Sequence, residues 1–84
     1  MKRVIYRVLP GPDGGWTLAG KGRVIPGGVT VQRYRRKVDA VASGKRRCRQ
    51  TWTLGVLAQL VIYGRNGRIQ SERTYGKDPR KYQG

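Results

Sequence analysis

The sequence contains no histidine and a single cysteine, Cys48, among its 84 residues. One thiol cannot form an internal disulfide, and protein zinc sites are built mainly from cysteine and histidine. The sequence therefore predicts no disulfide, no metal centre and no bound cofactor.

Acidic residues are also scarce, and the four present are scattered: Asp13, Asp39, Glu72 and Asp78. With no histidine to act as a general base, this set gives little support to acid–base catalysis. Cationic neighbours would lower the pKa of Cys48 and favour its use as a nucleophile. The sequence shows, however, no residue that could act as its base or orient it. Packing on an apolar helix face explains Cys48 better, so we expect a protein that is not an enzyme.

Long hydrophobic runs are absent as well. No segment approaches the roughly 18 apolar residues that a membrane helix needs. Residues 4–9 are interrupted by Arg7 and ended by Pro10, too short a run for a secretory signal. We expect no membrane partner, and a protein of the cytoplasm of a bacterial or archaeal cell, or of an infected host cell.

Positive charge is what the chain has in excess. It carries 19 Lys and Arg against 4 Asp and Glu, which gives a formal net charge of +15. A field of this kind attracts polyanions, whereas solubility alone is served by a net charge of about 2–8. Nucleic acid is therefore the first expected partner, with DNA favoured over RNA.

The N-terminal half favours extended structure. Residues 3–9 are rich in β-branched and aromatic side chains and are closed by a dense turn signal at 10–15. Residues 16–19 and 23–25 continue the extended pattern, and residues 29–38 favour a strand with a basic end. This half is expected to form a meander of short strands.

A helix is expected after this meander. Ser43 could cap a helix within residues 43–57, whose Cys48, Trp52 and Val56 would share one buried face. Core packing is also the better interpretation for Trp16 and Trp52, rather than stacking on nucleic-acid bases.

The C-terminal part predicts a hairpin. Residues 59–63 and 68–72 are strand-like, and Asn66-Gly67 between them indicates a type I′ turn. The predicted fold is thus α+β: a small antiparallel sheet of four to five short strands with a C-terminal hairpin, packed on one helix. Residues 1–73 would form this single domain, and residues 74–84 a polar tail.

Two segments carry a family resemblance. Pro12-Asp13-Gly14-Gly15-Trp16, and residues 60–69 with Thr74-Tyr75-Gly76-Lys77-Asp78-Pro79, resemble a family of small bacterial, archaeal and phage proteins grouped as a domain of unknown function. The resemblance implies a small sheet on one helix and supplies no catalytic residues. In the helix region the chain departs from the family, because Ser43-Gly44-Lys45-Arg46-Arg47-Cys48-Arg49 replaces a helix rich in Ala and Glu.

Two basic segments, residues 33–37 and 45–49, are the strongest candidate site. Arginine, with 13 copies against 6 lysines, offers the guanidinium forks that suit phosphate. Arg65 and Arg68 flank the hairpin tip, where turn structure is as good an explanation as binding. The candidate nucleic-acid-binding residues are Arg33, Arg35, Arg36, Lys37, Lys45, Arg46, Arg47, Arg49, Arg65 and Arg68.

Three interpretations of these cations stay open at this point. The first is binding to nucleic acid, mainly through phosphate contacts and with weak sequence specificity. The second is a small phage-type regulatory protein that docks on an acidic surface of a host protein, such as RNA polymerase or a nuclease. The third is a merely solvated helix face.

Overall fold

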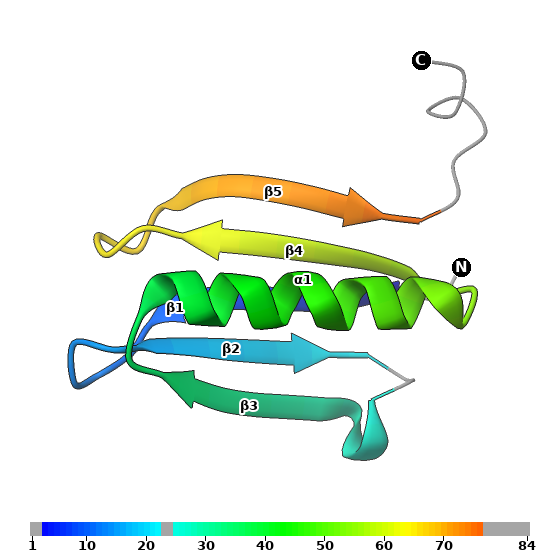
Figure 1. The fold of residues 1–84 in the computed structure, drawn as a ribbon, viewed down its shortest axis with the longest axis horizontal. Coiled ribbons are helices and arrows are strands. Elements are labelled where there is room, and N and C mark those ends of the chain that lie inside the picture. Colours follow the sequence, from blue (N-terminus) through cyan, green and yellow to red (C-terminus); the bar gives the residue numbers. More distant parts are fainter. Residues whose placement is uncertain (1–2, 23–24, 77–84) are drawn as a thin grey trace.

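A sheet with one helix across it makes up the computed structural model, in which residues 3–22 and 25–76 are described (Figure 1). The elements are β1 (Arg3–Pro10), β2 (Trp16–Lys21), the short 3-10 helix η1 (Pro26–Gly28), β3 (Val29–Tyr34), α1 (Lys37–Thr53), β4 (Leu57–Tyr63) and β5 (Ile69–Tyr75). The 5-stranded sheet has the order β3-β2-β1-β4-β5. The predicted α+β class is confirmed.

The strand directions differ from the predicted sheet in one place. β1–β2, β2–β3 and β4–β5 pair antiparallel, but β1 and β4 pair parallel, with Val4 opposite Ala58. Parallel strands need a long crossover connection, which α1 supplies between β3 and β4. The sheet is therefore mixed, with the first strand of the chain at its centre.

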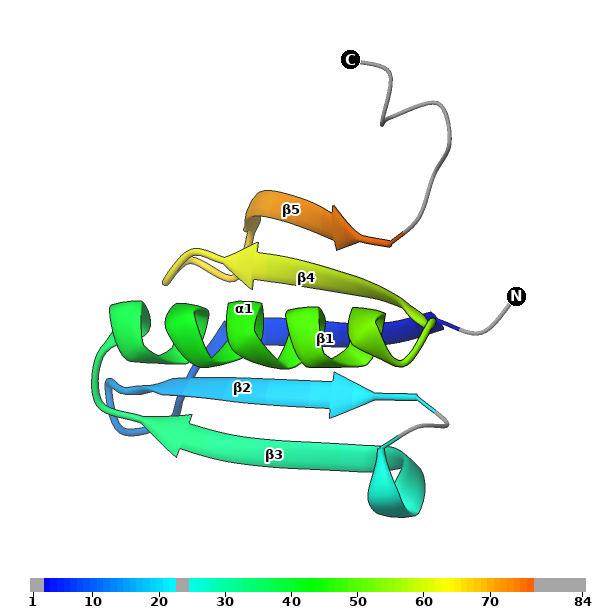
Figure 2. The same ribbon diagram turned by 45° about the vertical axis from the view of Figure 1, so that its right-hand side comes forward.

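The core lies between the sheet and α1. Successive strand residues point to opposite faces, so Val4, Tyr6 and Val8 of β1 all face the helix and are buried. Gly44 of α1 lies directly over this layer, because a Cβ there would stand 2.7 Å from Cδ1 of Leu60. Figures 1 and 2 show α1 running across one face of the sheet only.

The helix begins earlier in the chain than the sequence indicates. α1 starts at Lys37, with Arg36 as an N-cap residue that makes no side-chain capping bond. Ser43, the predicted cap, is instead buried in the second turn of the helix. Ala40, in the first turn, is also buried and belongs to the helix face that packs on the sheet. The helix ends at Thr53, and Gly55, with a φ of 79°, turns the chain toward β4.

The C-terminal hairpin is confirmed, but its turn is not type I′. Gly67 has a φ of 83°, whereas no described residue other than glycine has a positive φ, so Asn66 does not adopt the left-handed conformation that a type I′ turn requires. The Asn66 side chain instead accepts a hydrogen bond of 3.0 Å from the Arg68 backbone N–H. Thr74 and Tyr75 belong to β5, and residues 77–84 of the predicted tail lie outside the described residues.

Three chain connections meet at one end of the molecule. Because β4 runs parallel to β1, the β4–β5 turn lies at the same end as the β1–β2 turn and the β3–α1 connection (Figure 1, left). This arrangement brings together loop residues that are far apart in the sequence. No helix in the described part of the chain is long and apolar enough to cross a membrane.

Candidate nucleic-acid interface

Six of the predicted site residues lie at the end where the three connections meet. We call this set the basic end: Arg33, Arg35, Arg36, Lys37, Arg65 and Arg68. Arg33 comes from β3, Arg35 and Arg36 from the β3–α1 connection and Lys37 from the start of α1, and the β4–β5 turn supplies the last two. The fold thus joins the first basic segment to the hairpin arginines.

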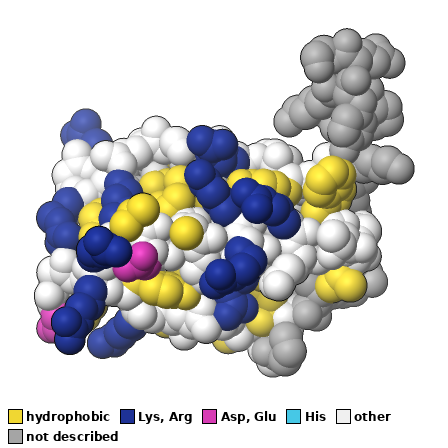
Figure 3. All heavy atoms as spheres, viewed as in Figure 1, with side chains coloured by type: hydrophobic (Ala, Val, Ile, Leu, Met, Phe, Trp, Pro, Cys, Tyr) yellow, Lys and Arg dark blue, Asp and Glu magenta, His cyan; other side chains and the backbone are white. Residues whose placement is uncertain are grey.

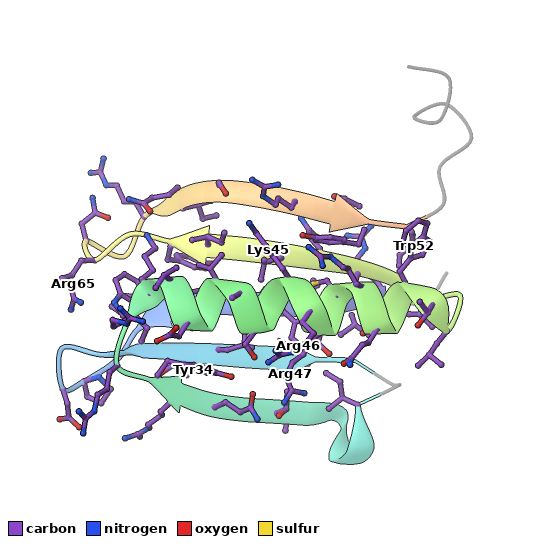
Figure 4. The ribbon with its side chains drawn as sticks, viewed as in Figure 1. Tyr34, Lys45, Arg46, Arg47, Trp52 and Arg65 are labelled. Atoms are coloured by element: carbon purple, nitrogen blue, oxygen red, sulfur yellow. The ribbon has the colours of Figure 1, made fainter. Side chains whose placement is uncertain are left out.

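Trp16 holds part of the basic end in place. Its side chain is buried, as predicted, and two cations lie against its ring: Lys37 Nζ at 4.8 Å and Arg65 Cζ at 4.9 Å from the centroid. Arg65 also donates a hydrogen bond of 2.8 Å to the carbonyl oxygen of Gly14, and Lys37 donates one to Gln70. Arg65 therefore ties the β4–β5 turn to the β1–β2 turn (Figure 4).

The other cations of the basic end have few internal partners. The ion pair between Arg36 and Asp39, at 3.3 Å, is the only one among residues 3–22 and 25–76, and both side chains are well exposed. Arg36 caps the helix without a side-chain bond, so the first-turn N–H groups of α1 add their partial positive charge here. Six cations at this end thus outnumber the two carboxylates, Asp13 and Asp39, that lie near them.

A cleft of about 480 Å³ opens beside the β1–β2 turn. Residues 11–17, which include Asp13, line the cleft together with Arg33, Tyr34 and Arg35. The turn packs tightly here, since a Cβ on Gly15 would stand 2.7 Å from the Tyr34 carbonyl oxygen. The cleft offers two guanidinium groups to an anion, with one carboxylate opposing them.

The second basic segment forms a separate surface on α1, which we call the helix ridge: Lys45, Arg46, Arg47 and Arg49. Arg46 and Arg49 are exposed, whereas Lys45 and Arg47 are half-buried along the helix flanks. At a rise of 1.5 Å per residue, the middle of the ridge is about 15 Å from Lys37 along the helix axis. Figure 3 shows Lys and Arg side chains both at the basic end and over the middle of the helix.

The prediction for Trp52 is wrong. Its side chain is 38% exposed near the C-terminal end of α1 (Figure 4), whereas Thr51 and Cys48 take the buried positions. Successive helix residues are about 100° apart, so Thr51 and Trp52 cannot both face the sheet. Trp52 is a surface aromatic beside the helix ridge.

Sequence reasoning also missed a set of cations on the sheet. Arg3 and Arg7 alternate with the buried Val4 and Tyr6 along β1, so they lie on the face of the sheet that α1 does not cover. Lys21 pairs with Ile5 across the β1–β2 ladder and shares that face. The period-2 alternation of residues 3–8 is the signal that could have found them.

Cys48 belongs to the buried core between α1 and the sheet. Its side chain is fully buried, and this burial raises the pKa of the thiol to about 12. A thiolate is the reactive form, so this residue stays protonated and inert near neutral pH. Residues 3–22 and 25–76 contain no cluster of Cys, Asp and Glu able to hold a metal ion.

The fold and these surfaces define a small α+β domain with little acidic compensation for its positive charge. The chain belongs to the family described as uncharacterized protein conserved in bacteria (DUF2188), whose model matches residues 6–75. That range runs from β1 to the end of β5 and includes both basic segments. No curated protein and no solved structure matches the chain.

Proposed function

We propose that this protein binds nucleic acid, DNA above all, mainly through the phosphate backbone, and that it is not an enzyme. The observation that carries the proposal is that the positive side chains have few carboxylate partners within the protein. Arg36–Asp39 is the one ion pair in the described part of a chain with a net charge of +15. Like charges held this close repel one another, and a polyanion relieves that repulsion.

The spacing of the cations supports a phosphate backbone as the ligand. Four positive side chains lie within residues 45–49 of α1, a length of roughly 6 Å at 1.5 Å per residue. Phosphates of one strand of duplex DNA advance about 3.4 Å each along the duplex axis, so this length is comparable with two phosphates. The exposed arginines Arg46 and Arg49 provide forks for bidentate contacts to phosphate oxygens.

Weak sequence specificity follows from the same side chains. A protein that recognises a base sequence holds side chains rigidly against the base edges. Packing or hydrogen bonds within the protein fix those side chains. No described residue holds the head group of Arg46 or Arg49 through a hydrogen bond or ion pair. These residues suit the backbone of any sequence.

Binding of a fluorescein-labelled random duplex, followed by anisotropy across a salt series, tests the proposal. We expect log K to fall linearly with log salt, and Arg46→Ala/Arg49→Ala to lower that slope by about 2. Arg73→Ala, on edge strand β5, serves as the control for removing one charge outside the helix. Wild-type protein that binds neither duplex nor single strand at about 150 mM salt would overturn the proposal.

A further inference from the structure

The sheet has a second face that no described element covers. Residues that alternate with the core side chains form this open face, and the register aligns them in rows across the strands. One row is Val31, Ala19, Arg7, Val61 and Glu72. The next row is Val29, Lys21, Ile5, Gln59 and Thr74.

Apolar side chains make up much of the open face. Val29 and Val31 of β3 are 59% and 63% exposed, and Ile69 of β5 is 53% exposed. Ile5 and Leu9 of β1 lie between these edges on the same face and are half-buried. A chain this poor in apolar residues leaves several exposed apolar side chains on one face outside its core, which favours an interaction site there.

Arg7 lies at the centre of this face without a partner. It is half-buried on the central strand between Ala19 and Val61, and no described residue accepts a hydrogen bond or ion pair from its side chain. The carboxylate on its row, Glu72, is two strands away, about 10 Å, and accepts a hydrogen bond of 3.0 Å from Gln59. A guanidinium among apolar neighbours is well placed to contact an anion.

Other cations surround Arg7. A groove of about 480 Å³ is lined by Arg3, Ile5, Arg7, Lys21 and Gly22. Arg33, paired with Thr17, stands on the same face at its outer edge. The open face therefore combines apolar side chains with four cations against the single carboxylate of Glu72, which favours a ligand that is anionic and also presents flat apolar surface.

Of the possible occupants, a single strand of nucleic acid fits these properties best. A second copy of the chain would bring two sets of like charges together. A duplex fits poorly, because five strands at about 4.8 Å are roughly 19 Å across, wider than a major groove of about 12 Å. On the outside of a duplex the apolar side chains would face only phosphates and sugars, whereas a single strand exposes its bases.

We propose that the open face of the sheet is a binding site for single-stranded nucleic acid. Arg3, Arg7, Lys21 and Arg33 contact phosphates, and the bases lie on Ile5, Leu9 and Tyr63. Tyr63 pairs with Ile69 and supplies an aromatic ring on which a base can stack. The inference rests on the proposed function for its ligand class, and it adds a strand preference and a site apart from the helix ridge.

Matched double variants test the site by anisotropy with a labelled 20-mer of oligodeoxythymidine and a 20-bp random duplex. Arg3→Gln/Arg7→Gln removes two charges from the open face, and Arg46→Gln/Arg49→Gln removes two from the ridge. We expect the open-face variant to lose about tenfold affinity for the single strand and at most about threefold for the duplex, with the reverse for the ridge variant. Equal losses in both variants would overturn the inference.

Wild-type protein gives a second measurement that does not depend on any variant folding. Photocross-linking to an oligonucleotide that carries 5-bromouracil, followed by mass spectrometry, is expected to label peptides of β1 and β4. Labelling confined to α1, or duplex binding without single-strand binding, overturns this inference and leaves the proposed function standing. Absence of binding to either nucleic acid overturns both.

Discussion

The phenolic hydroxyl of Tyr34 is hydrogen-bonded to Ser43 Oγ at 2.6 Å and thereby joins the end of β3 to the buried side of α1. The same hydroxyl is 2.9 Å from Oε1 of Gln32. Ser43 is 3% exposed, so its hydroxyl depends on this partner rather than on water. A short polar network therefore fixes how the helix begins relative to the outer strand.

Tyr34→Phe should lower the free energy of unfolding by about 1–3 kcal/mol, because it leaves a buried hydroxyl without its partner. Urea denaturation followed by circular dichroism measures the change. Ser43→Ala and the double variant complete a thermodynamic cycle, in which the double variant should cost less than the sum of the two single changes. Simple additivity would show that the two hydroxyls do not interact.

Gly44→Ala should destabilise the protein even though alanine favours helices by about 1 kcal/mol. The new Cβ would stand 2.7 Å from Cδ1 of Leu60 and 3.3 Å from Cδ1 of Leu18, and both leucines are fully buried. Overpacking of this kind costs about 1–3 kcal/mol. Ala42→Gly, at an exposed position of the same helix, calibrates the propensity effect. A more stable Gly44→Ala variant would contradict the tight packing of α1 on the sheet.

Stability should fall at alkaline pH partly because of Cys48. Burial raises its pKa to about 12 in the folded protein, against the ordinary thiol value of 9.0. The unfolded chain therefore loses the proton first, and this contribution is complete below pH 9 and is lost as pH rises toward 12. The slope should approach about 1.4 kcal/mol per pH unit. Cys48→Ala should remove this slope. If the free energy of unfolding of the wild type and of Cys48→Ala changed equally with pH, the prediction for Cys48 would be wrong.

Arg65→Ala should cost about 1 kcal/mol of stability, because it removes both the contact with the Trp16 ring and the hydrogen bond to Gly14. Arg68→Ala is the matched control, since Arg68 is an exposed residue of the same turn whose side chain makes no such contact in the described structure. Urea midpoints measure both changes. Equal losses in the two variants would mean that Arg65 does not tie the turns together.

Local sequence patterns were enough to predict part of the fold. The β-branched and aromatic content of residues 3–9 and the hairpin signal of residues 59–72 are local to each segment, and both elements are present. Cys48 likewise occupies the buried helix face that its spacing predicts.

The remaining features depend on contacts between distant segments. Residues 35–38 continue a β-favouring pattern, and only the burial of Ala40 in the core and the hydrogen bond between Ser43 and Tyr34 show that a helix begins at Lys37. The parallel pairing of Val4 with Ala58 leaves no local trace in either strand. The same pairing brings Arg65 to Gly14, so the composition of the basic end could not be derived from spacing along the chain.

The central position of β1 has a consequence for the order of folding. Its two neighbours are β2, which follows immediately, and β4, which comes only after the helix. During synthesis the β1–β2–β3 meander emerges first, and its apolar inner side stays uncovered until α1 and β4 arrive. Such long-range pairing slows folding and exposes strand edges to aggregation. Residues 1–34 already carry six cations against one carboxylate, and this excess of positive charge would keep neighbouring copies apart during this interval.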